Sequence, residues 1–174
     1  MKTYDPSNEF DEEYFEFGLF MSRREYKTIN RRLIRGRESS ASEGKYLGSV
    51  PPYGYRRQKL EKEKGYTLVE EPKEAAVVRK IFTMFNHYNG TKIIANALND
   101  DGVPTRHGEL WNYSTVASIL TNPVYIGKIR RGYCKQTKSF ENGEVKKRIK
   151  HLRNMNDYTL CEGLHPPLIE EDQF

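Results

Sequence analysis

The chain has 174 residues, 36% of them hydrophobic and 30% charged, which is enough for one modest core with an appended arm. Two cysteines exclude a disulfide framework, and no apolar run is long enough for a signal peptide or a membrane span. The net charge of +5 is compatible with a polyanionic partner. From these features we expect a cytoplasmic protein that does not contact a membrane.

The distribution of charge is more informative than its total. Residues 21–60 carry 11 basic against three acidic side chains, and residues 127–153 carry 10 against two. The compensating acidic residues lie in 9–16 and 157–172. Two concentrated basic segments predict a surface that binds a polyanion. The alternative is a pair of solvated charged faces.

A long helix is predicted over residues 8–43. Apolar residues recur every three or four positions at Phe10, Tyr14, Phe17 and Met21, and Ile29 and Leu33 continue the stripe. So long a helix needs support, and we expect its first half to pack on another chain or another domain. Its second half is rich in arginine and would suit contacts with phosphates.

Residues 44–55, GKYLGSVPPYGY, interrupt that helix with three glycines and two prolines. Proline favours an extended backbone and glycine permits close approach to another surface. With Lys45, Arg56 and Arg57 around it, the segment could follow a DNA groove, or it could simply connect two domains. A short strand at 66–69 is expected to pair with 54–58.

Two amphipathic helices follow. The first, 72–89, has a predicted apolar stripe of Ala76, Val77, Ile81, Phe82 and Phe85. The second, 91–101, is expected to begin at a capping Thr91 and to bury four residues, Ile93, Ile94, Ala97 and Leu98. With the next helix they predict a three-helix core that holds Trp111.

That next helix lies within residues 109–127. Asn112, Ser114 or Thr115 could cap it, and Pro123 ends it. One face would bury Val116, Ile119 and Leu120, and the opposite face presents small or hydrogen-bonding groups that suit a DNA major groove: Tyr113, Ser114, Ala117 and Ser118. Together with 91–101 it predicts a helix-turn-helix. An ordinary helical hairpin with a solvated polar face is the alternative.

A basic hairpin is predicted after this helix. Residues 125–130 alternate as a strand, 146–152 would form the return strand, and Asn142-Gly143 is a strong hairpin signal. This order is typical of a winged helix. Cys161 and His165 have a ligand-like spacing, with Cys134 and His151 as further candidates, but no Cys-x-x-Cys pair supports them, and we expect no metal site and no cofactor.

Several motifs in this order resemble one family. They are Glu25-x-x-x-Ile29-x-x-Arg32-x-x-x-Gly36, Gly44, PPYGY at 51–55, EPKEAAVVRKIF at 71–82, GVPTRHGELWNYSTVASILTNPVYIG at 102–127 and GLHPPLIEEDQF at 163–174. The chain is similar to the large serine recombinases of phages and mobile elements. The resemblance implies that 1–43 is the long helix at the end of the catalytic domain, 44–55 a linker and 56–174 the recombinase DNA-binding domain.

The resemblance also implies a parent enzyme that cuts both DNA strands through a phosphoserine linkage and religates them. The family's catalytic domain, with its nucleophilic serine, has no counterpart ahead of Asp5, so we expect a bacterial or phage-encoded fragment that has no catalytic residues and binds DNA without cleaving it. Self-association would belong to the full-length protein. A winged-helix transcriptional regulator with an N-terminal dimerisation helix is the alternative function, whereas no constellation of residues supports a nuclease.

The predicted fold is mainly α with a small β-hairpin (α+β): a long N-terminal helix followed by a domain that resembles a helix-turn-helix or winged helix. The predicted partner is double-stranded DNA. Its contacts are predicted to be Arg31, Arg32, Arg35, Arg37, Lys45, Tyr46, Arg56, Arg57, Arg106, Tyr113, Ser114, Thr115, Ser118, Arg130 and Arg131.

Overall fold

The computed structural model describes residues 7–141, 144–151 and 158–174, and the chain divides into two compact units, Met1–Ser39 and Ser40–Phe174. The first unit consists of most of helix α1, Glu9–Ser42, which closely matches the predicted 8–43. Asn8 accepts a hydrogen bond from the Phe10 amide at 3.1 Å and so caps the helix.

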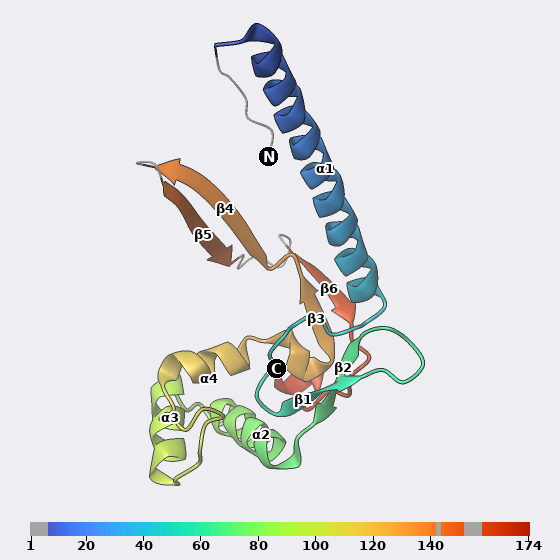
Figure 1. The fold of residues 1–174 in the computed structure, drawn as a ribbon. Coiled ribbons are helices and arrows are strands. Elements are labelled where there is room, and N and C mark those ends of the chain that lie inside the picture. Colours follow the sequence, from blue (N-terminus) through green and yellow to red (C-terminus); the bar gives the residue numbers. More distant parts are fainter. Residues whose placement is uncertain (1–6, 142–143, 152–157) are drawn as a thin grey trace. The chain divides into compact units, whose positions relative to one another are not determined.

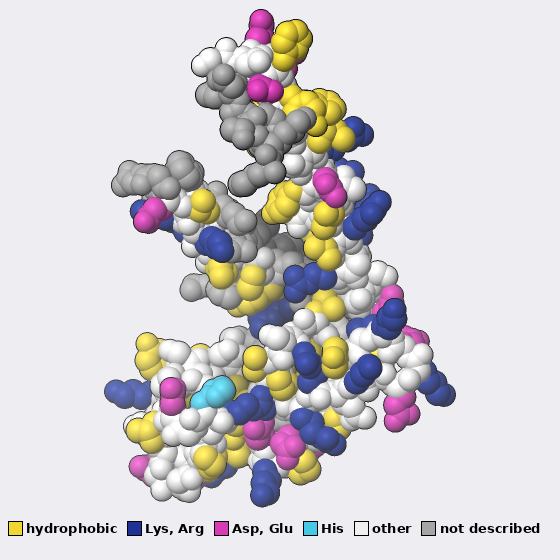
Figure 2. Space-filling model, viewed as in Figure 1, with side chains coloured by type: hydrophobic (Ala, Val, Ile, Leu, Met, Phe, Trp, Pro, Cys, Tyr) yellow, Lys and Arg dark blue, Asp and Glu magenta, His cyan; other side chains and the backbone are white. Residues whose placement is uncertain are grey.

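The apolar stripe of α1 is exposed within its own unit. The exposed fraction is 83% for Phe10 and still 44% for Met21, and Figure 2 shows hydrophobic side chains on the surface of this helix. A lone helix has no core in which to bury them. Packing of this stripe on another chain or domain stays a prediction.

The second unit contains short strands and helices (Figure 1). The chain order of its elements is β1 (Tyr55–Lys59), β2 (Tyr66–Glu70), α2 (Pro72–Asn86), α3 (Thr91–Asp100), α4 (Tyr113–Leu120), the 3₁₀ helix η1 (Pro123–Ile126), β3 (Lys128–Arg131), β4 (Cys134–Glu141), β5 (Glu144–His151), β6 (Thr159–Glu162) and the 3₁₀ helix η3 (Glu171–Gln173). With α1 included, the structure confirms the predicted mainly α fold with a small β component.

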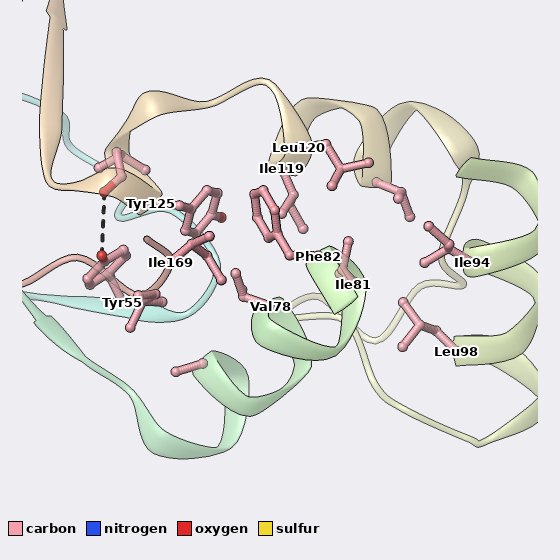
Figure 3. Packing of buried hydrophobic residues seen from close by; sticks show 14 of the residues in the cluster. Tyr55, Val78, Ile81, Phe82, Ile94, Leu98, Ile119, Leu120, Tyr125 and Ile169 are labelled. Carbon is pink, nitrogen blue, oxygen red and sulfur yellow. Dashed lines mark hydrogen bonds between the residues drawn. The ribbon is translucent and has the colours of Figure 1, made fainter. Parts of the chain in front are cut away.

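One hydrophobic core joins the three helices to the end of the chain (Figure 3). Trp111 is buried in it, as predicted, and Leu168 and Ile169 enter it from the C-terminal segment. The amides of these last two residues both donate to the Tyr125 carbonyl, at 2.9 and 3.0 Å. The helices contribute Ala75, Val78, Ile81, Phe82, Ile94, Ala95, Leu98, Val116, Ile119 and Leu120.

The inward faces of α2 and α3 differ from the prediction by about one residue. On α2, Ala75 and Val78 are buried instead of Ala76, Phe85 is 44% exposed and Val77 is only partly buried. The prediction placed the centre of the stripe too far towards Phe85, because a period of 3.6 residues defines the width of an apolar face better than its direction.

The predicted start and face of α3 are also partly wrong. Ile93 is 58% exposed, whereas Ala95 is buried. The cap position is occupied by Gly90, which makes no side-chain cap hydrogen bond, and Thr91 is the first residue inside the helix. A threonine inside the first turn cannot take the extended backbone conformation that the cap position requires.

Among the described residues the strands form three sheets, each of two antiparallel strands. β1 pairs with β2, with Tyr55 opposite Glu70 and Lys59 opposite Tyr66, which confirms the pairing predicted for this region. β4 pairs with β5, so that Glu141 lies opposite Glu144. The Asn142-Gly143 signal at their junction lies outside the described residues.

The predicted strand over 125–130 is confirmed only for 128–130, and its predicted pairing with 146–152 is wrong. Pro123 begins η1, whose cap Asn122 accepts from the Val124 amide, and the chain becomes extended only at Lys128. Gly127, with φ of +78°, makes the reversal between the two. β3 pairs with β6, Ile129 lying opposite Cys161, whereas most of 146–152 belongs to β5. The basic hairpin is therefore β4–β5, whose strands pack mainly on each other.

Candidate nucleic-acid interface

Helix α4 has a polar, exposed face, and its start is defined by an asparagine cap. Asn112, one of three predicted caps, holds the extended backbone and accepts from the Thr115 amide at 2.9 Å and the Thr115 hydroxyl at 3.1 Å. Val116, Ile119 and Leu120 point into the core, as predicted. The residues left exposed on α4 are Tyr113, Ser114, Thr115 and Ser118.

The long connection between α3 and α4 is held by Trp111. The Asn99 amide group donates to the Trp111 carbonyl at 2.9 Å, and the Trp111 amide donates back to Asn99 Oδ1 at 2.8 Å. The Trp111 indole N–H donates to the Val103 carbonyl at 3.0 Å. These bonds tie the connection to α3, and α4 packs against α3. The helix-turn-helix stays a prediction.

A groove of about 440 Å³ lies between the polar face of α4 and the segment before β1. Pro52 and Tyr53 line it from that segment, and Ser114, Thr115 and Ser118 line it from α4. Asn122 lines it too, although no pattern in the sequence singled this residue out as a contact. An asparagine immediately before a proline often caps a helix, and this was the sequence signal that could have marked Asn122.

The segment 44–55 packs closely against the rest of the second unit. The Tyr46 amide donates to the Tyr66 carbonyl at 2.7 Å, and the Tyr53 hydroxyl donates to the Pro104 carbonyl at 3.1 Å. Gly54 has φ of +92°, and a Cβ there would lie 3.0 Å from both Leu168 and Val78. Only glycine avoids this crowding and the strained backbone. The predicted domain boundaries at residues 43 and 55 stay predictions.

Two residues predicted to contact DNA are instead committed to contacts inside the protein. The buried Lys45 lies 2.5 Å from a Glu43 oxygen and 2.8 Å from a Glu63 oxygen, and these bonds, Glu43 first, raise its pKa. Arg106 is half-buried and bonds Glu74 and three backbone carbonyls. We therefore leave Lys45 and Arg106 out of the proposed DNA contacts. Charge patterns in the sequence did not show their acidic partners.

The other predicted arginines of this unit lie on two strands. Arg56 and Arg57 are exposed on β1, and the Arg57 guanidinium lies 4.1 Å from the centre of the Tyr66 ring. Arg130, on β3, donates to Asn122 Oδ1 at 3.0 Å and lies 4.0 Å from the centre of the Tyr133 ring. Since Asn122 lines the groove, Arg130 lies at its edge. Arg130 and Arg131 belong to the β3–β6 sheet and not to the basic hairpin.

Further basic side chains are exposed outside the groove. On α1 these are Arg31, Arg32, Arg35 and Arg37, all from the first unit. On β5 they are Lys146, Lys147, Arg148 and Lys150, which contribute to the second basic run of the sequence but were not among the predicted contacts.

The tyrosines around the groove are neutral hydrogen-bonding groups. Burial raises the pKa of Tyr53, helped by the negative charge of Glu74, and burial likewise raises the pKa of Tyr125. The Tyr125 hydroxyl donates to the Tyr53 carbonyl at 2.8 Å. Within the described ranges there is no group of three or more potential metal ligands, and no described helix is long and apolar enough to cross a bilayer.

A family model and a solved structure match this chain. The model of the Recombinase family matches residues 72–174. The fold is similar to the solved structure described as "Crystal Structure of a LSR-DNA Complex", where LSR denotes a large serine recombinase, with a TM-score of 0.54 and 18% sequence identity. The similarity covers 82% of this chain and 38% of that one.

Proposed function

Because the chain belongs to the Recombinase family, we propose that it binds a specific double-stranded DNA site as the DNA-binding region of a large serine recombinase. The observation that carries the proposal is the groove at α4, where an uncharged, hydrogen-bonding helix face opens beside the 51–55 segment. The solved structure to which the fold is similar is a complex with DNA, which supports the same partner.

The dimensions of α4 suit a major groove. An α-helix with its side chains is about 10–12 Å across, which matches the major-groove width of about 12 Å, and α4 is an eight-residue helix. Ser114, Thr115 and Ser118 offer hydroxyl groups that both donate and accept hydrogen bonds, which is the chemistry needed to read base edges. Tyr113, at the start of the helix, is exposed and adds a further hydroxyl to this face.

Phosphate contacts are proposed for arginines of both units. In the second unit these are the exposed Arg56 and Arg57, with Tyr46 near Arg57, and the partly buried Arg130 and Arg131. In the first unit they are the exposed Arg31, Arg32, Arg35 and Arg37. Such contacts position the protein on the duplex and supply most of the salt dependence, but they carry little sequence information.

The process that this binding serves is, we propose, site-specific DNA recombination. Strand cleavage would be carried out by the serine nucleophile of the family's catalytic domain, and the residues described here would locate the site. No observation in the structure favours a winged-helix transcriptional regulator over this function.

The test is selection of bound duplexes from a random pool, followed by affinity measurements on the selected site and its single-base variants at two salt concentrations. We expect binding with a slope of log K against log salt of about −5, as for about six phosphate contacts. A slope near zero, or no preferred sequence, would contradict the proposal. Incubation with the selected site should leave no covalent serine–DNA adduct.

Two substitutions separate base reading from phosphate contact. Ser118→Ala should change the preference at one or two base positions by about 1–3 kcal/mol, with a modest effect on unrelated DNA. Arg130→Ala should weaken all sequences about equally and reduce the salt slope by about one unit. The opposite pattern would mean that β3 reads the bases and α4 does not.

A further inference from the structure

Arg106 holds the 51–55 segment through its backbone. One of its terminal nitrogens donates to the Pro51 carbonyl at 2.6 Å, and the other donates to the carbonyls of Pro52 at 3.2 Å and Tyr55 at 2.9 Å. These bonds join residues more than 50 positions apart in the sequence. A planar guanidinium with five N–H donors can make such a set of contacts, whereas a lysine ammonium cannot.

The carboxylate of Glu74 holds the same segment through a backbone amide. It accepts from the Gly54 amide at 2.8 Å, and it is paired with Arg106 through Nε at 3.1 Å and through a terminal nitrogen. The side chains of Arg106 and Glu74 are only 26% and 20% exposed. One ion pair on α2 and the α3–α4 connection therefore binds both the carbonyls and an amide of the 51–55 segment. We call these contacts the Arg106–Glu74 clamp.

The clamp controls one wall of the α4 groove. Tyr53, which lines that wall, lies edge-on to Trp111 with ring centres 5.1 Å apart, and Trp111 is fixed to α3 by Asn99. The other wall is α4. Since the clamp sets where Pro52 and Tyr53 lie, it sets the distance between this segment and the face proposed to read bases.

We infer that Arg106 is a positioning residue for DNA recognition: it holds the 51–55 segment in its binding conformation before DNA arrives and does not itself contact a phosphate. The inference rests on the proposed function. A segment ordered in advance loses less conformational entropy on binding, so the clamp should raise affinity and sharpen base discrimination without adding to the salt dependence.

Arg106→Lys separates this role from a phosphate contact. A phosphate ligand tolerates lysine, because an ammonium also binds phosphate. The clamp does not tolerate it, because one ammonium cannot hold three carbonyls and a carboxylate. We expect Arg106→Lys to lower affinity for the selected site roughly tenfold and to leave the salt slope unchanged. Arg79→Lys is the matched control, because Arg79 lies on α2, pairs with Glu70 and does not line the groove, and this variant should bind as the wild type does.

Glu74→Gln provides a second variant with an opposite electrostatic expectation. Removing a negative charge should by itself strengthen binding to DNA. If Glu74 acts through the clamp, the variant should instead weaken specific binding and reduce discrimination between single-base variants. In Glu74→Gln the Arg106 bonds to the three carbonyls can still form. This variant therefore tests the clamp even if Arg106→Lys does not fold.

Hydrogen exchange of the DNA-free protein supplies an independent measurement. In both variants the amides of Gly54 and Tyr55 should exchange faster, while amides in the middle of α3 keep their protection. If the wild type binds no DNA, the proposed function fails and the inference fails with it, even when exchange confirms that the clamp orders the segment. If the wild type binds and both variants keep its affinity and base preference, only the inference is overturned. A third variant, Arg106→Gln, removes the positive charge. If Arg106→Lys binds with wild-type affinity and Arg106→Gln has a reduced salt slope, Arg106 is a phosphate ligand and the inference is overturned as well.

Discussion

Substitution of Asn112 separates the stability of α4 from its function. Asn112→Ala removes an acceptor that receives two hydrogen bonds from Thr115, at 2.9 and 3.1 Å. The site is exposed, so water replaces part of the loss, and the free energy of unfolding should fall by about 1 kcal/mol. For a folded unit of this size, the unfolding temperature should fall by about 3–5 °C.

Asn112→Asp should have the opposite balance of effects. The carboxylate still accepts both bonds and interacts favourably with the positive end of the helix dipole, so stability should equal or exceed that of the wild type. Because Asn112 lines the α4 groove, the added negative charge would face the proposed DNA phosphates. Affinity should therefore fall, and the salt slope should decrease in magnitude by about one unit.

The assay combines thermal unfolding followed by circular dichroism with anisotropy titration of a labelled duplex. Asn96→Ala and Asn96→Asp, on an exposed position of α3 outside the groove, are the matched controls. If Asn112→Asp is as unstable as Asn112→Ala, the cap is not the source of stability. If Asn112→Asp is stable and binds DNA as tightly as the wild type, the start of α4 does not face DNA, and our reasoning about the groove is refuted.

Three further expectations follow from the core and from α1. Deleting Met1–Phe20 should leave the unfolding temperature of the second unit unchanged, because the apolar residues removed are exposed within α1; a large decrease would show that they pack on that unit. Burial lowers the pKa of His165, so its contribution to stability is present above the ordinary histidine pKa of about 6.5 and is lost as the pH falls towards the lowered value. Chemical denaturation at several pH values should show this loss, which His165→Gln should reduce and the exposed His107→Gln should not. Tyr55→Phe removes a hydroxyl that donates to the Pro166 carbonyl at 2.8 Å and should cost about 1 kcal/mol of unfolding free energy, whereas unchanged stability would mean that this bond contributes nothing.

The sequence by itself determined where most elements lie and what the exposed face of α4 contains. These features depend on local signals: the helical period of α1, the proline that starts α2, and the Asn112 cap followed by Val116, Ile119 and Leu120. A cap and an apolar stripe act within a few residues of each other, so their consequences can be read without knowing the rest of the fold. The order of the motifs along the chain likewise indicates the family without any tertiary contact being known.

Tertiary structure alone decided which faces of α2 and α3 are buried, which strands pair and which cations are available for a ligand. β3 pairs with β6, about 30 residues further along the chain. The sequence had instead indicated a partner at 146–152, beyond the Asn142-Gly143 hairpin signal, but residues 146–151 of that segment pair with β4. Arg106 looked like one more exposed cation until the fold brought Glu74 and the 51–55 carbonyls to it. Such contacts join residues far apart in the chain. They depend on the packing of whole elements, and no local pattern of charge or hydrophobicity encodes them.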